Sequence, residues 1–252
     1  MNDAVLEARH LSKTYGGVRA VDDVSFVVNA GERVALIGPN GAGKTTCFNL
    51  VNGQLAPDAG AVLLAGKPIG GLAPPAIARL GVGRTFQVAA TFPSMTVREN
   101  VMLALLGRSR QDGGLLASVM TAANIAADTL LARVHCAELA ARHCATLAYG
   151  DAKRVELALA LAGGPRLLLM DEPTAGMAPD SRADLMEVAS TIARNDGIAV
   201  LFTEHDMDVV FGFADRVLVL DHGRVIAAGT PAEVRADPQV QAVYLGTPVS
   251  VP

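Results

Sequence analysis

Residues 38–46 read Gly-Pro-Asn-Gly-Ala-Gly-Lys-Thr-Thr and stand between an apolar run at 34–37 and a helical pattern that begins near Thr45. In such a strand–loop–helix unit, glycines let backbone N–H groups surround the α and β phosphates of a nucleotide. Lys44 can reach the β and γ oxygens, and the Thr45 hydroxyl can bind Mg²⁺. The sequence therefore predicts a triphosphate site formed by Gly38, Pro39, Asn40, Gly41, Ala42, Gly43, Lys44, Thr45 and Thr46.

The composition limits the classes of protein that this chain can belong to. A length of 252 residues allows one large domain, or a core with a smaller attached unit. The formal net charge is −4 and no run of Lys and Arg occurs, which argues against a nucleic-acid surface. No stretch of eighteen apolar residues and no secretory signal is visible, so we expect a cytoplasmic chain that does not span a membrane.

The periodicity of apolar residues predicts the sheet. Alternating apolar and polar residues in the first thirty positions predict antiparallel strands at an edge. Continuous apolar runs, typical of strands buried on both faces, alternate with helical patterns further along. These runs lie at 34–37, 167–171, 199–203 and 217–220. Strands that alternate with helices favour a mainly parallel, doubly wound sheet.

A helical stretch runs from Thr96 to about Leu147, with Thr96 as N-cap and Glu99 completing a capping box. We therefore expect an α/β P-loop NTPase (RecA-like) fold, in which a mainly parallel sheet carries an antiparallel β edge and a helical subdomain. The predicted nucleotide-binding core comprises residues 1–86 and 157–252, and the predicted helical subdomain comprises residues 87–156.

Two adjacent acids follow a buried strand, because residues 167–171 read Leu-Leu-Leu-Met-Asp and Glu172 comes next. An acid at the end of such a strand can hold Mg²⁺ through its water shell, and a second acid can polarise an attacking water. We assign the first role to Asp171 and the second to Glu172. The chain has no Asn-Lys-x-Asp segment that would read guanine, so ATP is favoured over GTP.

The order of these motifs resembles that of the ATP-binding subunit of ATP-binding cassette (ABC) transporters, from about Leu6 to Gly246. Residues 147–151, Leu-Ala-Tyr-Gly-Asp, occupy the position of the family's signature motif and look like a variant of Leu-Ser-Gly-Gly-Gln. The resemblance implies that this segment opens a helix whose N-terminus faces the γ-phosphate bound by a partner subunit. Two nucleotides would then be held between two subunits. The implied nucleotide contacts are Ala148, Tyr149, Gly150 and Asp151.

The signature position departs from the common family pattern at two residues. Ala148 replaces a serine, so a hydroxyl donor to the γ-phosphate is missing and the backbone donors must replace it. Asp151 replaces a glutamine: its charge favours its own helix N-terminus but opposes a nearby triphosphate, and the sequence does not decide between these effects. Leu-Ala-Tyr-Gly resembles the variant of branched-chain amino-acid importers. Leu159 stands where the family often has arginine.

Three further site residues follow from the resemblance. Gln87 matches the glutamine that contacts Mg²⁺ or the attacking water, the alternative being a solvated loop residue. His205 matches the switch histidine that bonds the γ-phosphate, the alternative being a structural histidine. Tyr15 matches the aromatic that stacks on adenine, the alternative being a ring packed in a turn. The resemblance thus implies Glu172, His205, Gln87 and Lys44 as catalytic residues, and Thr45, Gln87 and Asp171 as metal ligands.

The function that the resemblance implies is the ATP-binding and ATP-hydrolysing subunit of an importer of branched-chain or related amino acids. Its cofactors would be ATP and Mg²⁺. Its partners would be a second ATP-binding subunit, identical or related, transmembrane permease subunits and, indirectly, a solute-binding protein, with no nucleic acid. The chain would lie at the cytoplasmic face of the cell membrane as a peripheral protein. Two alternatives stay open: a soluble ABC ATPase that acts on DNA or ribosomes, and a small-molecule phosphotransferase.

Overall fold

The computed structural model describes residues 4–85, 91–108 and 116–245. Its centre is a six-stranded sheet with the strand order β10-β9-β3-β8-β7-β6. The strands from β9 to β6 are parallel, and β10 joins the edge antiparallel to β9. The strands are β3 (Arg33–Ile37), β6 (Val82–Thr85), β7 (Leu167–Asp171), β8 (Ala199–Thr203), β9 (Arg216–Asp221) and β10 (Arg224–Gly229). The predicted mainly parallel sheet is confirmed.

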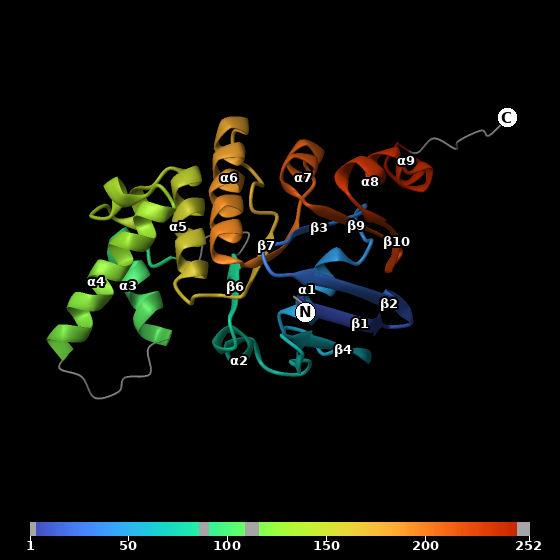
Figure 1. Ribbon diagram of the computed structural model, residues 1–252, viewed down its shortest axis with the longest axis horizontal. Coiled ribbons are helices and arrows are strands. Elements are labelled where there is room, and N and C mark those ends of the chain that lie inside the picture. Colours follow the sequence, from blue (N-terminus) through green and yellow to red (C-terminus); the bar gives the residue numbers. More distant parts are fainter. Residues whose placement is uncertain (1–3, 86–90, 109–115, 246–252) are drawn as a thin grey trace.

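A second, antiparallel sheet is built from the N-terminal part of the chain and has the order β2-β1-β4-β5. The long strands β1 (Ala4–Tyr15) and β2 (Val18–Asn29) pair along their length, and β4 (Ala59–Leu64) pairs with the other side of β1. The short β5 (Lys67–Pro68) completes the sheet. Figure 1 shows this sheet beside the parallel one, so the antiparallel edge that the alternating pattern predicts is confirmed.

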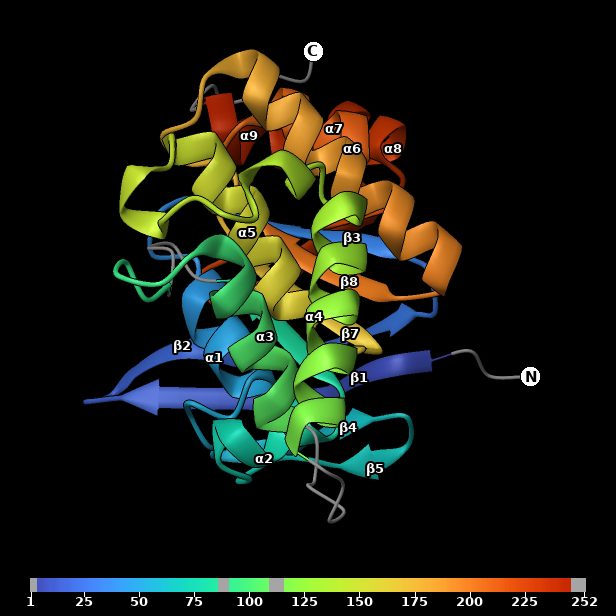
Figure 2. The ribbon, with the colours of Figure 1, turned by 90° about the vertical axis from the view of Figure 1, so that its left-hand side faces the viewer.

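The helices from α3 to α9 form a row across one side of the molecule in Figure 1, whereas α1 and α2 lie apart from that row; Figure 2 shows the end of the molecule that α3 and α4 occupy. At one end, α3 (Val97–Arg108) and α4 (Leu116–Arg133) pack side by side, and α5 (Tyr149–Leu161) lies between them and α6 (Pro179–Asp196). The other helices are α1 (Lys44–Val51), α2 (Pro74–Arg79), α7 (Met207–Phe213), α8 (Pro231–Ala236) and α9 (Pro238–Leu245). Within the described ranges, no helix is long and apolar enough to cross a membrane.

Side chains of the parallel strands point alternately into two separate hydrophobic clusters, because successive residues of a strand face opposite sides of a sheet. In β3, Val34 and Leu36 pack in one cluster with Phe48 of α1, between the two sheets. Ala35 and Ile37 belong to the other cluster, which α5 and α6 cover. Both faces of β3 are therefore buried, which explains why its sequence is a continuous apolar run.

The helical stretch predicted from residue 96 to about 147 is interrupted. It consists of α3, α4 and two short 3₁₀ turns, at Ala137–Leu139 and Cys144–Thr146. The predicted capping box is present: the Glu99 N–H donates to Thr96 Oγ1 at 3.2 Å, and the Thr96 N–H donates to Glu99 Oε2 at 2.7 Å. After α4 the chain turns at His135, whose φ of 55° no regular helix can accommodate.

Candidate nucleotide-binding site

The loop after β3 has a backbone that only glycine accommodates easily. Gly41 and Gly43 have φ values of 82° and 102°, in the left-handed region. A Cβ atom on Gly43 would lie 2.2 Å from the carbonyl oxygen of Ala20, so no side chain fits there. Gly43 is also the N-cap of α1, whose first backbone N–H groups are left free for an anion. The structure thus gives the loop the shape of a phosphate cradle.

Lys44 is the first residue of α1, and its side chain folds back over the loop. Its Nζ donates hydrogen bonds to the carbonyl oxygens of Gly38 at 2.6 Å and Pro39 at 3.0 Å. Burial lowers the pKa of the ammonium, although the carboxylates of Glu172 and Asp171 act in the opposite direction. These two acids therefore lie close enough to Lys44 to interact with it electrostatically. The ammonium of Lys44 therefore links the phosphate loop electrostatically to the two acids that follow β7.

Asp171 ends β7 beside Thr203, its register partner at the end of β8. Its Oδ1 accepts a hydrogen bond from Thr203 Oγ1 at 2.7 Å, and its Oδ2 lies 3.7 Å from Nη2 of Arg84. Its side chain remains 23% exposed, so the carboxylate is held in place yet accessible. The hydroxyl-bearing Thr45 is an exposed residue of α1. A carboxylate and a hydroxyl, completed by phosphate oxygens and water, fit Mg²⁺, which keeps several non-protein ligands.

Glu172 and His205 form a pair. Nε2 of His205 lies 2.8 Å from Oε1 of Glu172, and both side chains are partly exposed. The Glu172 backbone has a φ of 46°, which is uncommon for a residue with a side chain. Its N–H donates to both the carbonyl oxygen and Oγ1 of Thr203, each at 3.1 Å. The structure therefore brings together the two residues that sequence analysis assigns to activating water and contacting the γ-phosphate.

The signature segment begins α5. Ala148 is the N-cap residue and makes no capping hydrogen bond, and Gly150 lies in the first turn. A Cβ on Gly150 would make only ordinary contacts, at 3.5 Å from Ser181 Cβ and 3.7 Å from Met177 Cε. The fold of this chain therefore does not require glycine here. The three atoms nearest to that Cβ belong to Ser181 and Met177 rather than to the phosphate loop.

Two signature side chains are already engaged within the chain. The Tyr149 hydroxyl donates to the carbonyl oxygen of Ala175 at 3.1 Å, so this side chain ties α5 to the segment after Glu172. Asp151 Oδ1 accepts from Nη2 of Arg154 at 2.6 Å, and Arg154 also pairs with Asp184 of α6. Arg154 therefore compensates the charge of Asp151 only in part, because the same guanidinium also pairs with Asp184.

The remaining predicted residues have two different outcomes. Tyr15 ends β1 just before the Gly16–Gly17 turn and is 46% exposed, with Nζ of Lys13 5.9 Å from its ring centre. The side chain is thus accessible, and its contact with adenine stays a prediction. Gln87 lies outside the described residues, so its assigned contact stays a prediction.

Sequence analysis missed three polar residues at this site: Arg84, Thr203 and Glu204. Arg84 lies in β6 beside Asp171, and burial lowers the pKa of its guanidinium although Asp171 acts in the opposite direction. Glu204 is buried and accepts hydrogen bonds from Thr174. The sequence did contain an indication of their importance, because each is a polar residue within or next to an apolar strand, and a buried polar side chain needs a hydrogen-bond partner. The sequence alone does not name that partner.

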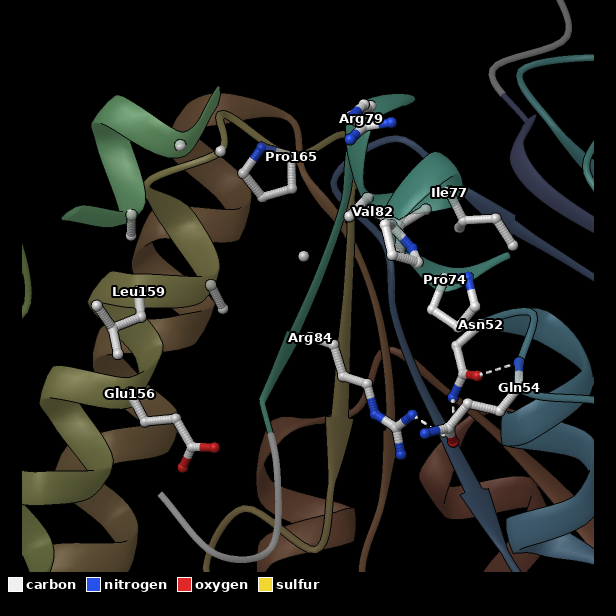
Figure 3. A pocket seen from close by; sticks show the side chains of 17 residues that line it. Asn52, Gln54, Pro74, Ile77, Arg79, Val82, Arg84, Glu156, Leu159 and Pro165 are labelled. Atoms are coloured by element: carbon white, nitrogen blue, oxygen red, sulfur yellow. Dashed lines mark hydrogen bonds between the residues drawn. The ribbon is translucent and has the colours of Figure 1, made fainter. Parts of the chain in front are cut away.

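A cleft of about 550 Å³ lies away from the phosphate loop, between α2, β6, α3 and α5. Figure 3 shows Leu159 and Glu156 of α5 on one side of it, and Ile77, Pro74 and Arg84 on the other. Arg84 Nη1 donates to Oε1 of Gln54 at 2.7 Å at its base. Leu159, whose residue type the sequence did not explain, thus forms part of an apolar wall.

Comparison with known proteins identifies the family. The profile of a family described as "ABC transporter" matches residues 21–175, more than half of the chain. The chain is 39% identical over 253 residues to the high-affinity branched-chain amino acid transport ATP-binding protein LivG of Escherichia coli (strain K12), covering 98% of this chain and 99% of that protein. The chain belongs to the ABC transporter family. As a member it is a nucleotide-binding ATPase cassette, which confirms the resemblance found in the motif order.

Two other similarities show which groups of ABC transporter proteins this cassette resembles. The profile described as "Branched-chain amino acid ATP-binding cassette transporter" matches residues 224–250. The lipopolysaccharide export system ATP-binding protein LptB of Escherichia coli (strain K12) is 38% identical over 249 residues, covering 96% of the cassette and 98% of that protein. The relatives thus include ATP-binding proteins named for branched-chain amino acid transport and for lipopolysaccharide export.

Two solved structures resemble the cassette. The ADP conformation of MJ1267, an ATP-binding cassette of an ABC transporter, superposes with a TM-score of 0.84 at 31% identity, covering 97% of the cassette and 99% of that chain. The dimeric structure of MJ0796, a bacterial ABC transporter cassette, has a TM-score of 0.77 at 26% identity, covering 90% and 98%. The predicted P-loop NTPase fold is confirmed by these similarities.

Proposed function

We propose that the cassette hydrolyses Mg²⁺-ATP and energises the uptake of branched-chain or related amino acids through permease subunits. The observation that carries the catalytic part is the 2.8 Å contact between Glu172 and His205, next to Asp171 and Lys44. The match of residues 224–250 to a branched-chain amino-acid transporter profile supports the solute class, as does the similarity to LivG. The related proteins are named as transport proteins, so the DNA or ribosome alternative is not favoured.

The chemistry follows from what each side chain can do. The loop N–H groups and Lys44 would bind the β and γ phosphates, with Lys44 exchanging its two carbonyl partners for phosphate oxygens. Glu172 would accept a proton from the attacking water, and His205, whose Nε2 lies 2.8 Å from Glu172 Oε1, would help to orient that carboxylate. Thr45, Asp171 and Gln87 would hold Mg²⁺, which neutralises phosphate charge when bound. Tyr15 would stack on adenine.

We further propose that two cassettes close on the nucleotides, with Gly150 at the phosphate of the opposite subunit. The support is the glycine itself: a Cβ at residue 150 would make only ordinary contacts within this chain, so a contact from outside the chain would account for the glycine. The dimer of the similar cassette MJ0796 is consistent with this arrangement. The partner can be a second copy or a related chain.

We propose that the permease docks at the cleft between α2 and α5, with the cassette peripheral at the cytoplasmic face of the membrane. The cleft wall is largely apolar, and Leu159 contributes to it where the family often has arginine. Phe92, which precedes α3, is a large apolar residue that is 55% exposed. Residues 87–156, including α3 and α4, would form the subdomain that follows the permease.

The test is reconstitution of the cassette in proteoliposomes with the permease subunits that co-purify with it. ATP hydrolysis and accumulation of leucine, isoleucine and valine are measured together, with Glu172→Gln as the inactive control. Uptake that requires both ATP and Glu172 supports the proposal. Stimulation by lipopolysaccharide and not by amino acids would instead favour export, and co-purification with ribosomes or DNA would revive the soluble alternative.

A further inference from the structure

Three consecutive polar residues, Thr203, Glu204 and His205, follow the apolar part of β8, and each contacts the turn after β7. The two strands are parallel neighbours, so their C-terminal ends lie side by side. Thr203 bonds Asp171 and the Glu172 N–H, and His205 contacts the Glu172 carboxylate. The proposed mechanism gives a role only to His205 in this run, and Glu204 is the buried acid of the run.

The Glu204 side chain is buried, with 4% of the residue exposed, and both of its carboxylate oxygens are used. Oε1 accepts hydrogen bonds from the Thr174 N–H at 2.8 Å and from Thr174 Oγ1 at 2.6 Å. Oε2 accepts from the His205 N–H at 3.2 Å. Within the part of the chain that the structure describes, no cationic side chain pairs with it. A buried carboxylate is costly, so its position depends on these donors.

The hydrogen bonds of Glu204 connect the segment after β7, which carries Glu172, with the segment after β8, which carries His205. The distance between these segments determines how close Glu172 and His205 lie. One end of this link is Thr174, two residues after Glu172, and the other is the backbone of His205. On the N-terminal side of Glu172, its backbone N–H is already fixed by a hydrogen bond to Thr203 Oγ1. The left-handed backbone of Glu172 is an uncommon conformation that persists only where its surroundings hold it. Thr174 and Glu204 supply that support on the C-terminal side.

We propose that Glu204 is a positioning residue that acts through Thr174 to hold the Glu172 carboxylate at His205. The proposal rests on the proposed function, because it takes Glu172 as the base that activates water. The physical reason is that even a small displacement of a base from the water that it activates strongly lowers the rate of the chemical step. ATP binding depends on the phosphate loop, which these residues do not contact in the hydrogen bonds described, so it should change little.

Thr174 provides the matched pair of variants that tests this proposal. Thr174→Val keeps the shape but removes the hydroxyl donor to Glu204, whereas Thr174→Ser keeps the donor. The whole cassette is assayed for steady-state ATP hydrolysis, with kcat and KM for ATP determined separately, and its melting temperature is recorded. We expect Thr174→Val to lower kcat roughly tenfold, as the loss of one buried hydrogen bond at a catalytic position allows, with KM changed less than about twofold. We expect Thr174→Ser to restore most of kcat.

Glu204→Gln tests the contact between Glu204 and Thr174 from its other side. This variant also keeps the test possible if Thr174→Val does not fold. Its amide keeps the size of the side chain, but it cannot accept hydrogen bonds at both ends. We expect a loss of kcat similar to that of Thr174→Val, and little further loss when the two changes are combined, because both break one link. Fully multiplicative losses in the double variant would overturn the proposal.

The remaining outcomes separate this inference from the proposed function. Wild-type kcat in both Thr174→Val and Glu204→Gln would overturn the positioning role. Equal losses in Thr174→Val and Thr174→Ser, or a loss confined to KM, would also overturn it, because each points to packing or binding instead. If Glu172→Gln hydrolyses ATP normally, the catalytic assignment itself is wrong. If Glu172→Gln is inactive while Thr174→Val and Glu204→Gln are both normal, only the positioning role is lost.

Discussion

Glu172 is the residue on which the proposed chemistry depends most directly. Its carboxylate contacts His205, its N–H is bonded twice to Thr203, and its backbone is in the left-handed region. We predict that Glu172→Gln binds ATP but turns it over about 10² to 10⁴ times more slowly, because an amide cannot accept the proton of water. Equilibrium ATP binding and single-turnover hydrolysis check this. Near-normal turnover would remove Glu172 from its role.

Two glycines should respond in opposite ways to the same substitution. Gly43→Ala places a methyl group 2.2 Å from a backbone oxygen on left-handed backbone, so we predict a lower melting temperature and loss of ATP binding. Gly150→Ala meets no clash and adds a better helix former, so we predict unchanged or slightly higher stability. It should nevertheless abolish ATP-dependent dimerisation, measured by gel filtration in a Glu172→Gln background. Normal dimerisation of Gly150→Ala would contradict the proposed contact across subunits.

Ala148 is an N-cap residue without a capping side chain, at a position where the family has a hydroxyl. We predict that Ala148→Ser tightens the ATP-bound dimer by about 1 kcal/mol by adding a donor to the γ-phosphate. Because serine also caps α5, the variant should melt at a higher temperature as well. Ala148→Gly is the control, since glycine is favoured over alanine at an N-cap but adds neither a hydroxyl donor nor a charge. A dimer that both variants tighten equally would assign the gain to the helix alone.

At the scale of secondary-structure elements, one ion pair joins the beginnings of β3 and β9. Asp215 accepts hydrogen bonds from the Arg33 N–H and from Arg33 Nε, each at 2.9 Å. Partial burial raises the pKa of Asp215, but the hydrogen bonds from Arg33 outweigh it and the net pKa lies below the usual value. A lowered pKa in the folded state means that the contribution is present above the ordinary pKa of aspartate and is lost as the pH falls below it.

Because the pKa of Asp215 is lowered in the folded protein, we predict that the ion pair with Arg33 stabilises the protein less at acidic pH. Wild-type protein should unfold at a higher urea concentration than Asp215→Asn at pH 6, and the difference should shrink as the pH falls toward 3. The side chain is 44% exposed, so solvent screening keeps the effect small. Urea midpoints of both proteins, measured from pH 6 to pH 3, check this prediction. A difference that does not change with pH would show that the charge of Asp215 is not its cause.

At the scale of the whole molecule, the cleft between α2 and α5 provides the test of assembly. Leu159→Arg puts a charge on its apolar wall, so we predict that fewer permease subunits co-purify with the cassette. Ile125→Arg introduces the same charge on α4, at a residue that is 64% exposed and does not line the cleft. This control should keep the wild-type yield of complex. Equal losses in the two variants would argue against docking at the cleft.

The sequence predicted the parallel sheet and the phosphate loop, because both depend on local patterns. A continuous apolar run such as 34–37 and the glycines after it reveal their structure without any distant contact. The helical stretch after residue 96 was predicted as one unit, and its interruption at His135 was missed because left-handed backbone at a non-glycine residue has no clear sequence signal. The partners of Glu204 and Arg154 in other elements were missed for a related reason: Thr174 and Asp184 come near them only through the way β8 meets β7 and α5 meets α6.

The hydrogen bond from the Tyr149 hydroxyl to Ala175 has a kinetic consequence in a closed pair of cassettes. Ala175 lies three residues beyond Glu172, which would serve the nucleotide held by its own loop, whereas Tyr149 begins the helix that would face the nucleotide of the neighbour. One covalent segment and one hydrogen bond therefore connect both reaction centres inside each subunit. Turnover of the two ATP molecules should be cooperative, with a Hill coefficient above one that falls toward unity in Tyr149→Phe.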